Sequence, residues 1–101
     1  MTAEISLQQK VSLSTEVLLQ HLGGKSVLLD LKSELYFTQN EIATQMLLSL
    51  TESDSIQTAY NRLLEEYDVD PEKCKKDLLE FIERLVNAEL VEISDPSTVR
   101  K

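Results

Sequence analysis

The sequence predicts a small α+β domain in which a three-stranded antiparallel sheet is followed by three helices. The chain has 101 residues, which suits one domain with a modest core. Short apolar or alternating segments fill its first third, and apolar residues recur at spacings of three and four from residue 42 onward. Because sequential strands usually pair with their neighbours, we expect the sheet order one, two, three.

The strands are expected where short apolar segments lie between turn residues. Val11 and Leu13 alternate with polar residues, as in a half-buried strand. The segment VLLQHL, residues 17–22, is interpreted as a short helical turn closed by Gly23-Gly24. Two further apolar segments are joined at Lys32-Ser33. We therefore expect strands at residues 9–14, 26–31 and 34–37.

The first helix has a strong start signal. Thr38 and Glu41 form a T-x-x-E capping box, and Phe37 and Ile42 have the spacing of a hydrophobic staple. The apolar stripe that follows consists of Ile42, Met46, Leu47 and Leu50.

The remaining elements follow from similar signals. A second helix is expected from Asp54, and a third helix has Asp70 as its cap, Pro71 in its first turn and an end near Ala88. Residues 90–93 are expected to form a last short strand. The domain organisation is then a loose tail at 1–8, a folded domain at 9–93 and a polar tail at 94–101.

Composition restricts the classes of partner. The formal net charge of −8 disfavours nucleic acid and anionic membrane, which both need clustered Lys and Arg. No apolar run approaches the ~20 residues of a membrane span, and the first residues do not resemble a secretory signal. We therefore expect a soluble cytoplasmic protein.

Few residues could support catalysis or metal binding. The chain has one histidine, His21, and one cysteine, Cys74, so an internal disulfide and a multi-cysteine metal site are excluded. The Gly23-Gly24 pair is too short for a phosphate-binding loop. The carboxylates of DVDPE, residues 68–72, are explained better by helix capping than by a metal. We expect no catalytic residue, no cofactor and no metal.

The third strand raises the question of what covers it. Leu35, Tyr36 and Phe37 place a large side chain at every position, and the expected sheet order leaves this strand at an edge unless the C-terminal segment folds back onto it. An exposed apolar edge invites pairing with another chain. The third helix offers a second clue, because its apolar residues form two neighbouring stripes: Leu79, Ile82 and Val86, and Leu78, Phe81 and Leu85.

Two interpretations of these stripes remain open. Both stripes can form one broad core face, or the second can border a groove beside the edge strand. In the second case an extended peptide would add to the strand through main-chain hydrogen bonds and place side chains in apolar pockets of the helix. The polar residues Lys75, Asp77 and Arg84 would then set its orientation by charge.

Two stretches resemble the PqqD family. VLLDLKSELYFTQNEIATQMLLSL is similar to its strand, turn, aromatic pair, Asn and first helix, and YDVDPEKCKKDLLEFIERLVNAELVEI is similar to its second half. The likeness covers about residues 9–93 and implies a winged-helix-like fold. It also implies a recognition element for ribosomally made, modified peptides, which binds a precursor's leader as an added strand between the third strand and the third helix.

The resemblance also implies partners. SLSTEVLLQHL ahead of VLLDL looks most like the stand-alone subunits of lasso-peptide pathways, which hand the precursor to a leader peptidase and then a cyclase. A quinone-cofactor pathway with a radical S-adenosylmethionine enzyme is the alternative. The residues expected to contact the leader are Leu29, Glu34, Leu35, Tyr36, Phe37, Lys75, Asp77, Leu78, Phe81, Ile82, Arg84 and Leu85.

The sequence departs from the family where glycine is common. Glu34 follows the strand turn, Ala43 lies early in the first helix with Leu47 in place of an aromatic residue, and Glu89 ends the third helix. A helix that ends without glycine must place another residue in the left-handed conformation or fray, which costs about 1 kcal/mol.

Two other functions compete with a peptide-binding adaptor. A winged-helix DNA-binding regulator would have a similar fold, but its recognition helix needs an excess of basic side chains, and residues 71–89 are net acidic. The other competing function is that of a structural subunit, whose groove would be filled by its own tail or by a dimer partner. An enzyme is the class that the residues favour least.

Overall fold

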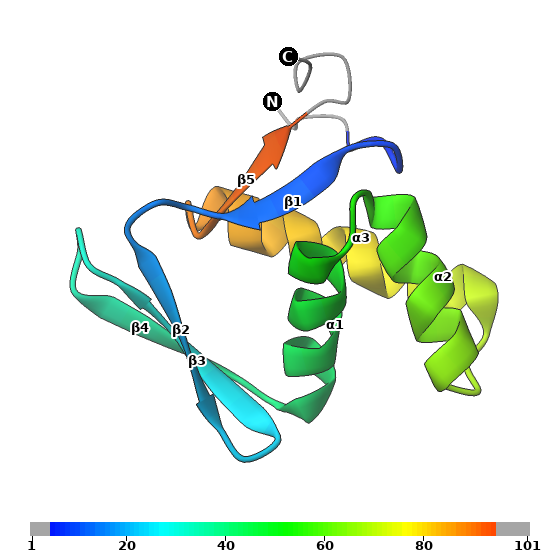
Figure 1. Cartoon of the computed structure of the whole chain (residues 1–101), viewed down its shortest axis with the longest axis horizontal. Coiled ribbons are helices and arrows are strands. Elements are labelled where there is room, and N and C mark those ends of the chain that lie inside the picture. The colour runs from blue at the N-terminus through cyan, green and yellow to red at the C-terminus, as the bar shows by residue number, and fades with distance from the viewer. Residues whose placement is uncertain (1–4, 95–101) are drawn as a thin grey trace.

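The structure, a computed structural model, describes residues 5–94, and the parts of both expected tails at 1–4 and 95–101 lie outside the described residues. Within these residues, four strands are followed by three helices and a fifth strand (Figure 1). The strands are β1 (Lys10–Leu13), β2 (Val17–Leu22), β3 (Lys25–Asp30), β4 (Leu35–Gln39) and β5 (Val91–Ser94). The helices are α1 (Glu41–Glu52), α2 (Ile56–Glu66) and α3 (Pro71–Asn87).

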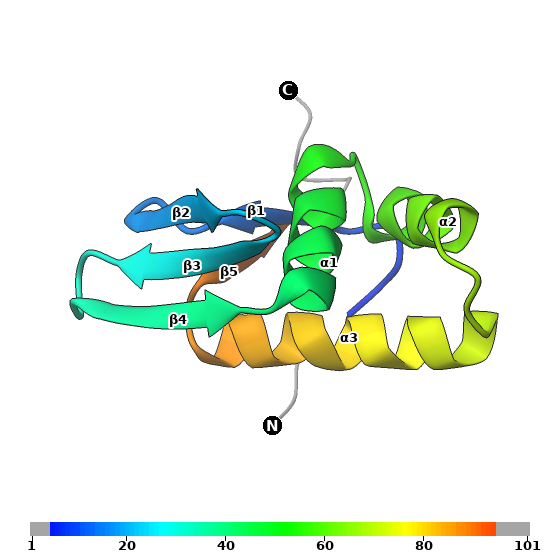
Figure 2. The ribbon, with the colours of Figure 1, turned by 90° about the horizontal axis from the view of Figure 1, so that it is seen from below.

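The predicted fold class is confirmed. A three-stranded antiparallel sheet in the order β2-β3-β4 precedes the three helices, and β1 and β5 form a separate antiparallel pair. The sheet lies beside α1, and α3 runs past the end of α1 on the side of β4 (Figure 2). This arrangement is compatible with the winged-helix-like description.

The assignment of residues 17–22 to a helical turn was wrong. They form β2, which pairs with β3 from Val17↔Asp30 to Leu22↔Lys25 across the two-residue turn Gly23-Gly24. Gly23 has φ 69°, in the left-handed region that glycine enters without steric penalty. Two apolar runs separated by two glycines form a hairpin because such turns match the twist of the strands.

The predicted pairing of the first strand was also wrong. Because β2 occupies the place beside β3, β1 pairs instead with β5, from Lys10↔Ser94 to Leu13↔Val91. The N–H of Ser14 donates to the carbonyl of Leu90 at 3.0 Å and continues this contact. The segments near the two ends of the described chain therefore lie side by side.

Helix α1 begins later than the capping box predicted. Thr38 lies within β4, paired with Val27, so it cannot cap a helix. Asn40 is the cap, and its side chain accepts a hydrogen bond from the N–H of Ala43 at 2.8 Å. The expected staple is not formed, since Ile42 is 59% exposed.

The other helix ends agree more closely with the sequence. Helix α2 is capped by Ser55, one residue after the predicted Asp54. The start of α3 is confirmed: the Asp70 side chain accepts from the N–H of Lys73 at 3.3 Å, and Pro71 occupies the first turn. The predicted end near Ala88 is confirmed as well.

The core joins the sheet, all three helices and the β1–β5 pair. Inside it, the hydroxyls of Ser26 on β3 and Thr44 on α1 form a buried hydrogen bond of 2.8 Å. Ile5 and Leu7, from the segment predicted as a tail, pack against the core, and the Leu7 carbonyl accepts from the N–H of Gln57 at 2.8 Å. The fully buried side chains of greatest volume are Leu28, Leu47, Leu50, Ile56, Leu78, Ile82 and Leu90.

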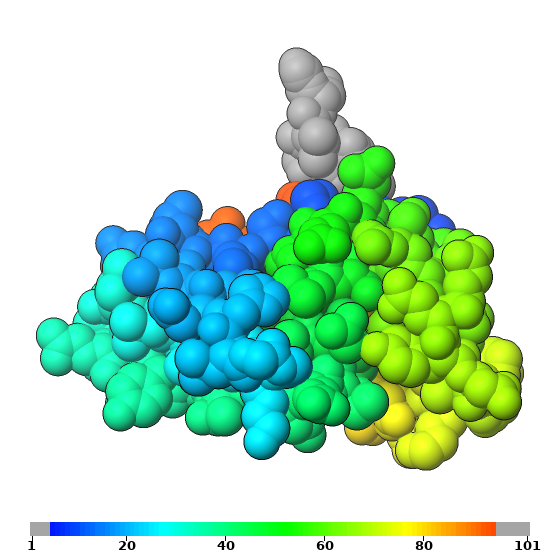
Figure 3. All heavy atoms as spheres, turned by 60° about the horizontal axis from the view of Figure 1, so that its bottom comes forward, coloured from blue at the N-terminus to red at the C-terminus, as the bar shows by residue number. Residues whose placement is uncertain are grey.

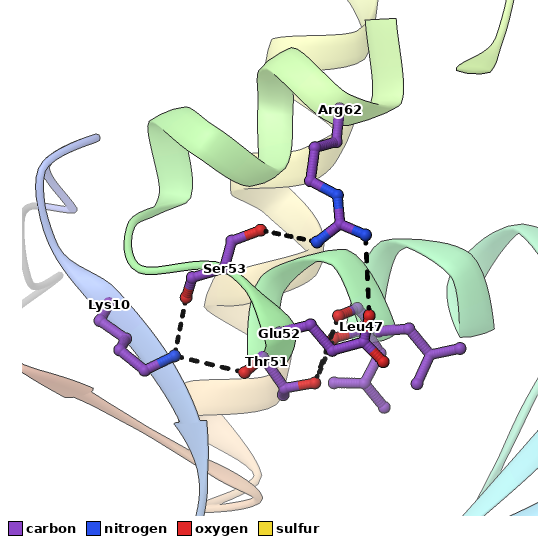
Figure 4. A network of polar contacts seen from close by, with 7 residues as sticks. Lys10, Leu47, Thr51, Glu52, Ser53 and Arg62 are labelled. Atoms are coloured by element: carbon purple, nitrogen blue, oxygen red, sulfur yellow. Dashed lines mark hydrogen bonds and ion pairs between the residues drawn. The ribbon is translucent and has the colours of Figure 1, made fainter. Parts of the chain in front are cut away.

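A polar network holds the C-terminal end of α1 (Figure 4). The Lys10 ammonium donates to the carbonyls of Thr51 at 3.3 Å and Ser53 at 2.7 Å. Arg62 donates to the Ser53 hydroxyl at 3.3 Å and lies 3.7 Å from the Glu52 carboxylate. The last turn of α1 has no basic residue of its own, so Lys10 supplies the positive charge that the helix dipole favours there.

Two glutamates lie in the left-handed region of backbone conformation, which favours glycine. Glu34 has φ 64° in the β3–β4 turn, and Glu89 has φ 61° after α3. At the end of α3, the N–H of Glu89 donates to Val86 at 2.9 Å and that of Leu90 to Leu85 at 3.0 Å. These bonds close the helix only if Glu89 keeps its strained conformation.

We expect Glu89→Gly and Glu34→Gly each to raise the free energy of unfolding by about 0.5–1 kcal/mol, because glycine removes the steric penalty of the left-handed region. Urea denaturation measures the change. Glu89→Ala, which retains the Cβ atom, is the control and should give no comparable gain. A glycine variant less stable than the alanine variant would contradict the explanation.

Candidate functional site

Strand β4 has one open edge. Its inner side pairs with β3 from Asp30↔Leu35 to Ser26↔Gln39, and no other strand within residues 5–94 pairs with it. The prediction of an edge strand is therefore confirmed, and β5 does not cover that edge because it pairs with β1. The open edge presents main-chain groups that can pair with an added strand.

The side chains of β4 alternate between the two faces of the sheet. Phe37 is half-buried against the core and is in register with Leu28. Tyr36 is 71% exposed on the opposite face, in register with Leu29. Leu35, at the start of the strand, is also exposed. Both faces of β4 therefore carry apolar side chains, which explains the run of three large residues in the sequence.

An open depression of about 310 Å³ lies between β4, the first turn of α1 and the C-terminal half of α3. Figure 2 shows β4 as the strand of the sheet nearest to α3. Phe81 and Leu85 are each only 4% exposed and line the depression beside Phe37, whereas Arg84 is exposed at its border. We call this depression the edge groove; its lining is Phe37, Thr38, Gln39, Asn40, Ala43, Phe81, Arg84, Leu85, Ala88 and Leu90.

The structure brings half of the predicted contact residues to this groove or its strand. Four of them line the groove, and Leu35 and Tyr36 lie on the same strand with exposed side chains. The four that line it are Phe37, Phe81, Arg84 and Leu85.

The other predicted residues lie elsewhere. Leu78 and Ile82 are fully buried in the core, at 1% and 0% exposure. Leu29 lies in the central strand on the face of Tyr36, and Glu34 occupies the β3–β4 turn. Lys75 is exposed outside the groove, and Asp77 lines a second pocket near the start of α3. Asp77 also forms an ion pair of 3.2 Å with Lys73.

Sequence reasoning missed the part of the groove that follows Phe37. Thr38, Gln39 and Asn40 line it because β4 runs two residues beyond its predicted end. Ala88 was missed on α3, although Phe81, Arg84, Leu85 and Ala88 follow one another at spacings of three, one and three on one helix face. That periodicity was the available signal.

The second pocket contains the chain's one cysteine. Burial raises the pKa of the Cys74 thiol above its ordinary value, and the Asp77 carboxylate raises it further by repelling the thiolate. A thiol that stays protonated at neutral pH is a weak nucleophile. The site therefore gives Cys74 none of the activation that catalytic cysteines have.

Within residues 5–94, no group of three or more His, Cys, Asp or Glu side chains is placed to hold a metal ion. None of the helices in that range combines the length and apolar character needed to cross a bilayer.

The fold and the groove define a small α+β domain with an open sheet edge facing a helix. The family model of coenzyme PQQ synthesis protein D (PqqD) matches residues 25–91, which is more than half of the chain. The chain therefore belongs to the PqqD family. A search of curated proteins gives no match.

Two solved structures are similar to this chain. The structure of TbiB1 in complex with the TbiA(beta) leader peptide has a TM-score of 0.75 and 28% identity, covering 80% of this chain and 94% of TbiB1. The structure of a lasso peptide synthetase B1 complexed with the leader peptide has a TM-score of 0.74, covering 82% of this chain and 98% of that protein. At 22% identity, the second likeness supports the fold alone.

We expect iodoacetamide at pH 8 to alkylate Cys74 more slowly than a free cysteine, because less thiolate is present. Asp77→Asn removes the nearby negative charge, lowers the thiol pKa and should raise the rate. Glu80→Gln, which removes an exposed charge elsewhere on α3, is the control. Mass spectrometry of timed samples measures the rate, and equal rates in both variants would contradict the role of Asp77.

Proposed function

We propose that this protein is a non-catalytic adaptor that binds the leader region of a ribosomally synthesised precursor peptide and presents it to tailoring enzymes. The observation that carries the proposal is the open edge of β4 beside a groove lined by Phe37, Phe81 and Leu85. The likeness to TbiB1, whose structure contains a leader peptide, supports it.

Strand addition at β4 would use both parts of this site. An extended segment pairs its main chain with the open edge, and alternate side chains then point toward the groove. There they would contact Phe81 and Leu85, which are already ordered by the core, so little side-chain entropy is lost on binding. Arg84, exposed at the border, would contact a polar or acidic residue of the leader.

The proposed partners are a leader peptide and the tailoring enzymes that act on its precursor. The structure of TbiB1, at 28% identity, contains a leader peptide, which supports a leader as one partner. The resemblance of the sequence to lasso-peptide pathway members makes a leader peptidase and a cyclase the enzymes that we propose it serves. The adaptor itself would carry out no chemistry. It would act in the cytoplasm, where the ribosome releases its peptide.

The direct test is fluorescence anisotropy with a labelled leader from a precursor gene neighbouring that of this protein, and with duplex DNA as a parallel probe. We expect saturable binding of the leader at micromolar or tighter affinity and no binding of DNA. Binding of DNA alone would favour the regulator, and binding of neither probe would overturn the adaptor.

Main-chain pairing has its own test. Leaders with a single N-methyl group, moved one residue at a time, lose one main-chain donor each. Since alternate residues of a strand point their N–H groups to the same side, affinity should fall at every second position across the paired segment. A uniform loss along the segment would exclude strand addition.

We expect Tyr36→Glu to weaken leader binding several-fold, because it replaces an apolar neighbour of the added strand with a charge. Tyr36 is 71% exposed, so the fold should be retained. The control is Leu18→Glu, at 51% exposure on the same face of the sheet as Tyr36 but in β2, the strand at the opposite edge. Phe81→Asp is unsuitable, because Phe81 is only 4% exposed and a charge there would destabilise the core.

A further inference from the structure

Ser14 joins three parts of the fold through three hydrogen bonds. Its N–H donates to the carbonyl of Leu90 at 3.0 Å, and its hydroxyl donates to the carbonyl of Glu89 at 3.0 Å. Both bonds hold the turn that follows α3. The carbonyl of Ser14 accepts from the N–H of Val17 at 3.1 Å, at the start of β2. Ser14 itself is half-buried and lies between β1 and β2.

The partners of Ser14 lead to the two walls of the edge groove. Val17 begins β2, which is joined through β3 to β4, the strand that forms the main-chain wall. On the other side, Ala88 and Leu90 flank Glu89, and both line the groove as part of the wall formed by α3 and its end. Ser14 therefore connects the two walls, although it does not line the groove itself.

Side chains fill the space between the sheet and α3 unevenly. At one end of the sheet, α1 lies directly against it (Figure 3), and the Ser26–Thr44 hydrogen bond joins the two. At the other end, an open depression of about 390 Å³ is lined by the first residue of β2, the last residue of β3, and Val86 and Glu89 at the end of α3. The hydrogen bonds of Ser14 bridge the gap that side chains leave open there.

We propose, on the basis of the proposed function, that Ser14 is a positioning residue for leader binding. By holding the end of α3 at a fixed distance from the sheet, it sets the width of the edge groove. An added strand needs such a fixed width, because neighbouring strands lie about 4.8 Å apart and the strand must also reach the side chains of α3. Glu89, at φ 61°, is in a conformation that costs energy for any residue with a Cβ atom. The two bonds from Ser14 to the successive carbonyls of Glu89 and Leu90 stabilise that turn.

The test compares leader binding by the wild type, Ser14→Ala and a matched control, Ser55→Ala. Both substitutions remove a half-buried hydroxyl that bonds to the main chain, at 3.0 Å for Ser14 and 3.1 Å for Ser55, but Ser55 caps α2 and does not line the groove. With the labelled leader of the direct binding assay, Ser14→Ala should bind about fivefold more weakly, the effect of losing one hydrogen bond from the binding-competent state. Ser55→Ala should bind as the wild type does.

A conservative variant separates the hydroxyl from the size of the side chain. Ser14→Thr retains the hydroxyl and should keep wild-type affinity, since the open depression beside Ser14 has room for one methyl group. Urea denaturation should show that all three variants are folded. Because Ser55→Ala also loses stability, a general loss of stability would weaken leader binding by both alanine variants alike, and that result would overturn the inference.

A second measurement uses the unaltered protein. Since coupling between two sites is reciprocal, bound leader should slow amide hydrogen exchange at Ser14, although this residue lies outside the groove. The N–H of Gln57, which donates to the carbonyl of Leu7 at 2.8 Å, is the control and should exchange at the same rate with and without leader. Equal leader affinities of Ser14→Ala and the wild type, or unchanged exchange at Ser14, would overturn the inference and leave the adaptor intact. Failure of the wild type to bind the leader would overturn the proposed function instead.

Discussion

The position of the open edge depends on how α1 is held against β3. The buried hydrogen bond of 2.8 Å between Ser26 and Thr44 fixes the start of α1 to the central strand, and Leu28 and Leu47 pack in the same core without exposure. Strand β4 ends at Gln39, Asn40 caps the next helix, and α1 begins at Glu41. The chain therefore leaves the strand directly and does not cover its open edge. Helix α3 then passes on the free side, so one wall of the groove is main chain and the other is side chain.

These two walls would contribute differently to peptide recognition. Main-chain pairing to β4 is nearly independent of the peptide's sequence, whereas Phe81, Arg84 and Leu85 on α3 present a particular shape and charge. Related domains that read different peptides would therefore be expected to differ most on the groove face of α3. The requirement for β4 is geometric: it must remain extended and unpaired.

Features that depend on nearby residues, such as helix caps, were predicted better from the sequence than the pairing of strands. Asp70 and Pro71 marked the start of α3 correctly because a cap acts within four residues. The capping box predicted at Thr38 is not formed, because Thr38 pairs with Val27 and belongs to β4. A local capping pattern contains no information about such pairing between strands. The same limit applies to α3. Periodicity predicted that Leu78 and Phe81 lie on neighbouring positions of one apolar face. The packing of β4 and α1 determines that Phe81 borders the groove and Leu78 does not.

The pairing of β1 with β5 has a consequence for how the chain is made. Lys10 and Ser94 are partners, although nearly the whole described chain separates them. On the ribosome, the β2–β3–β4 meander can form from contiguous residues, whereas β1 must wait until β5 has been made. Contacts between distant segments also form late and slow folding. A nascent chain would therefore acquire the open edge of β4 before β1 and β5 pair.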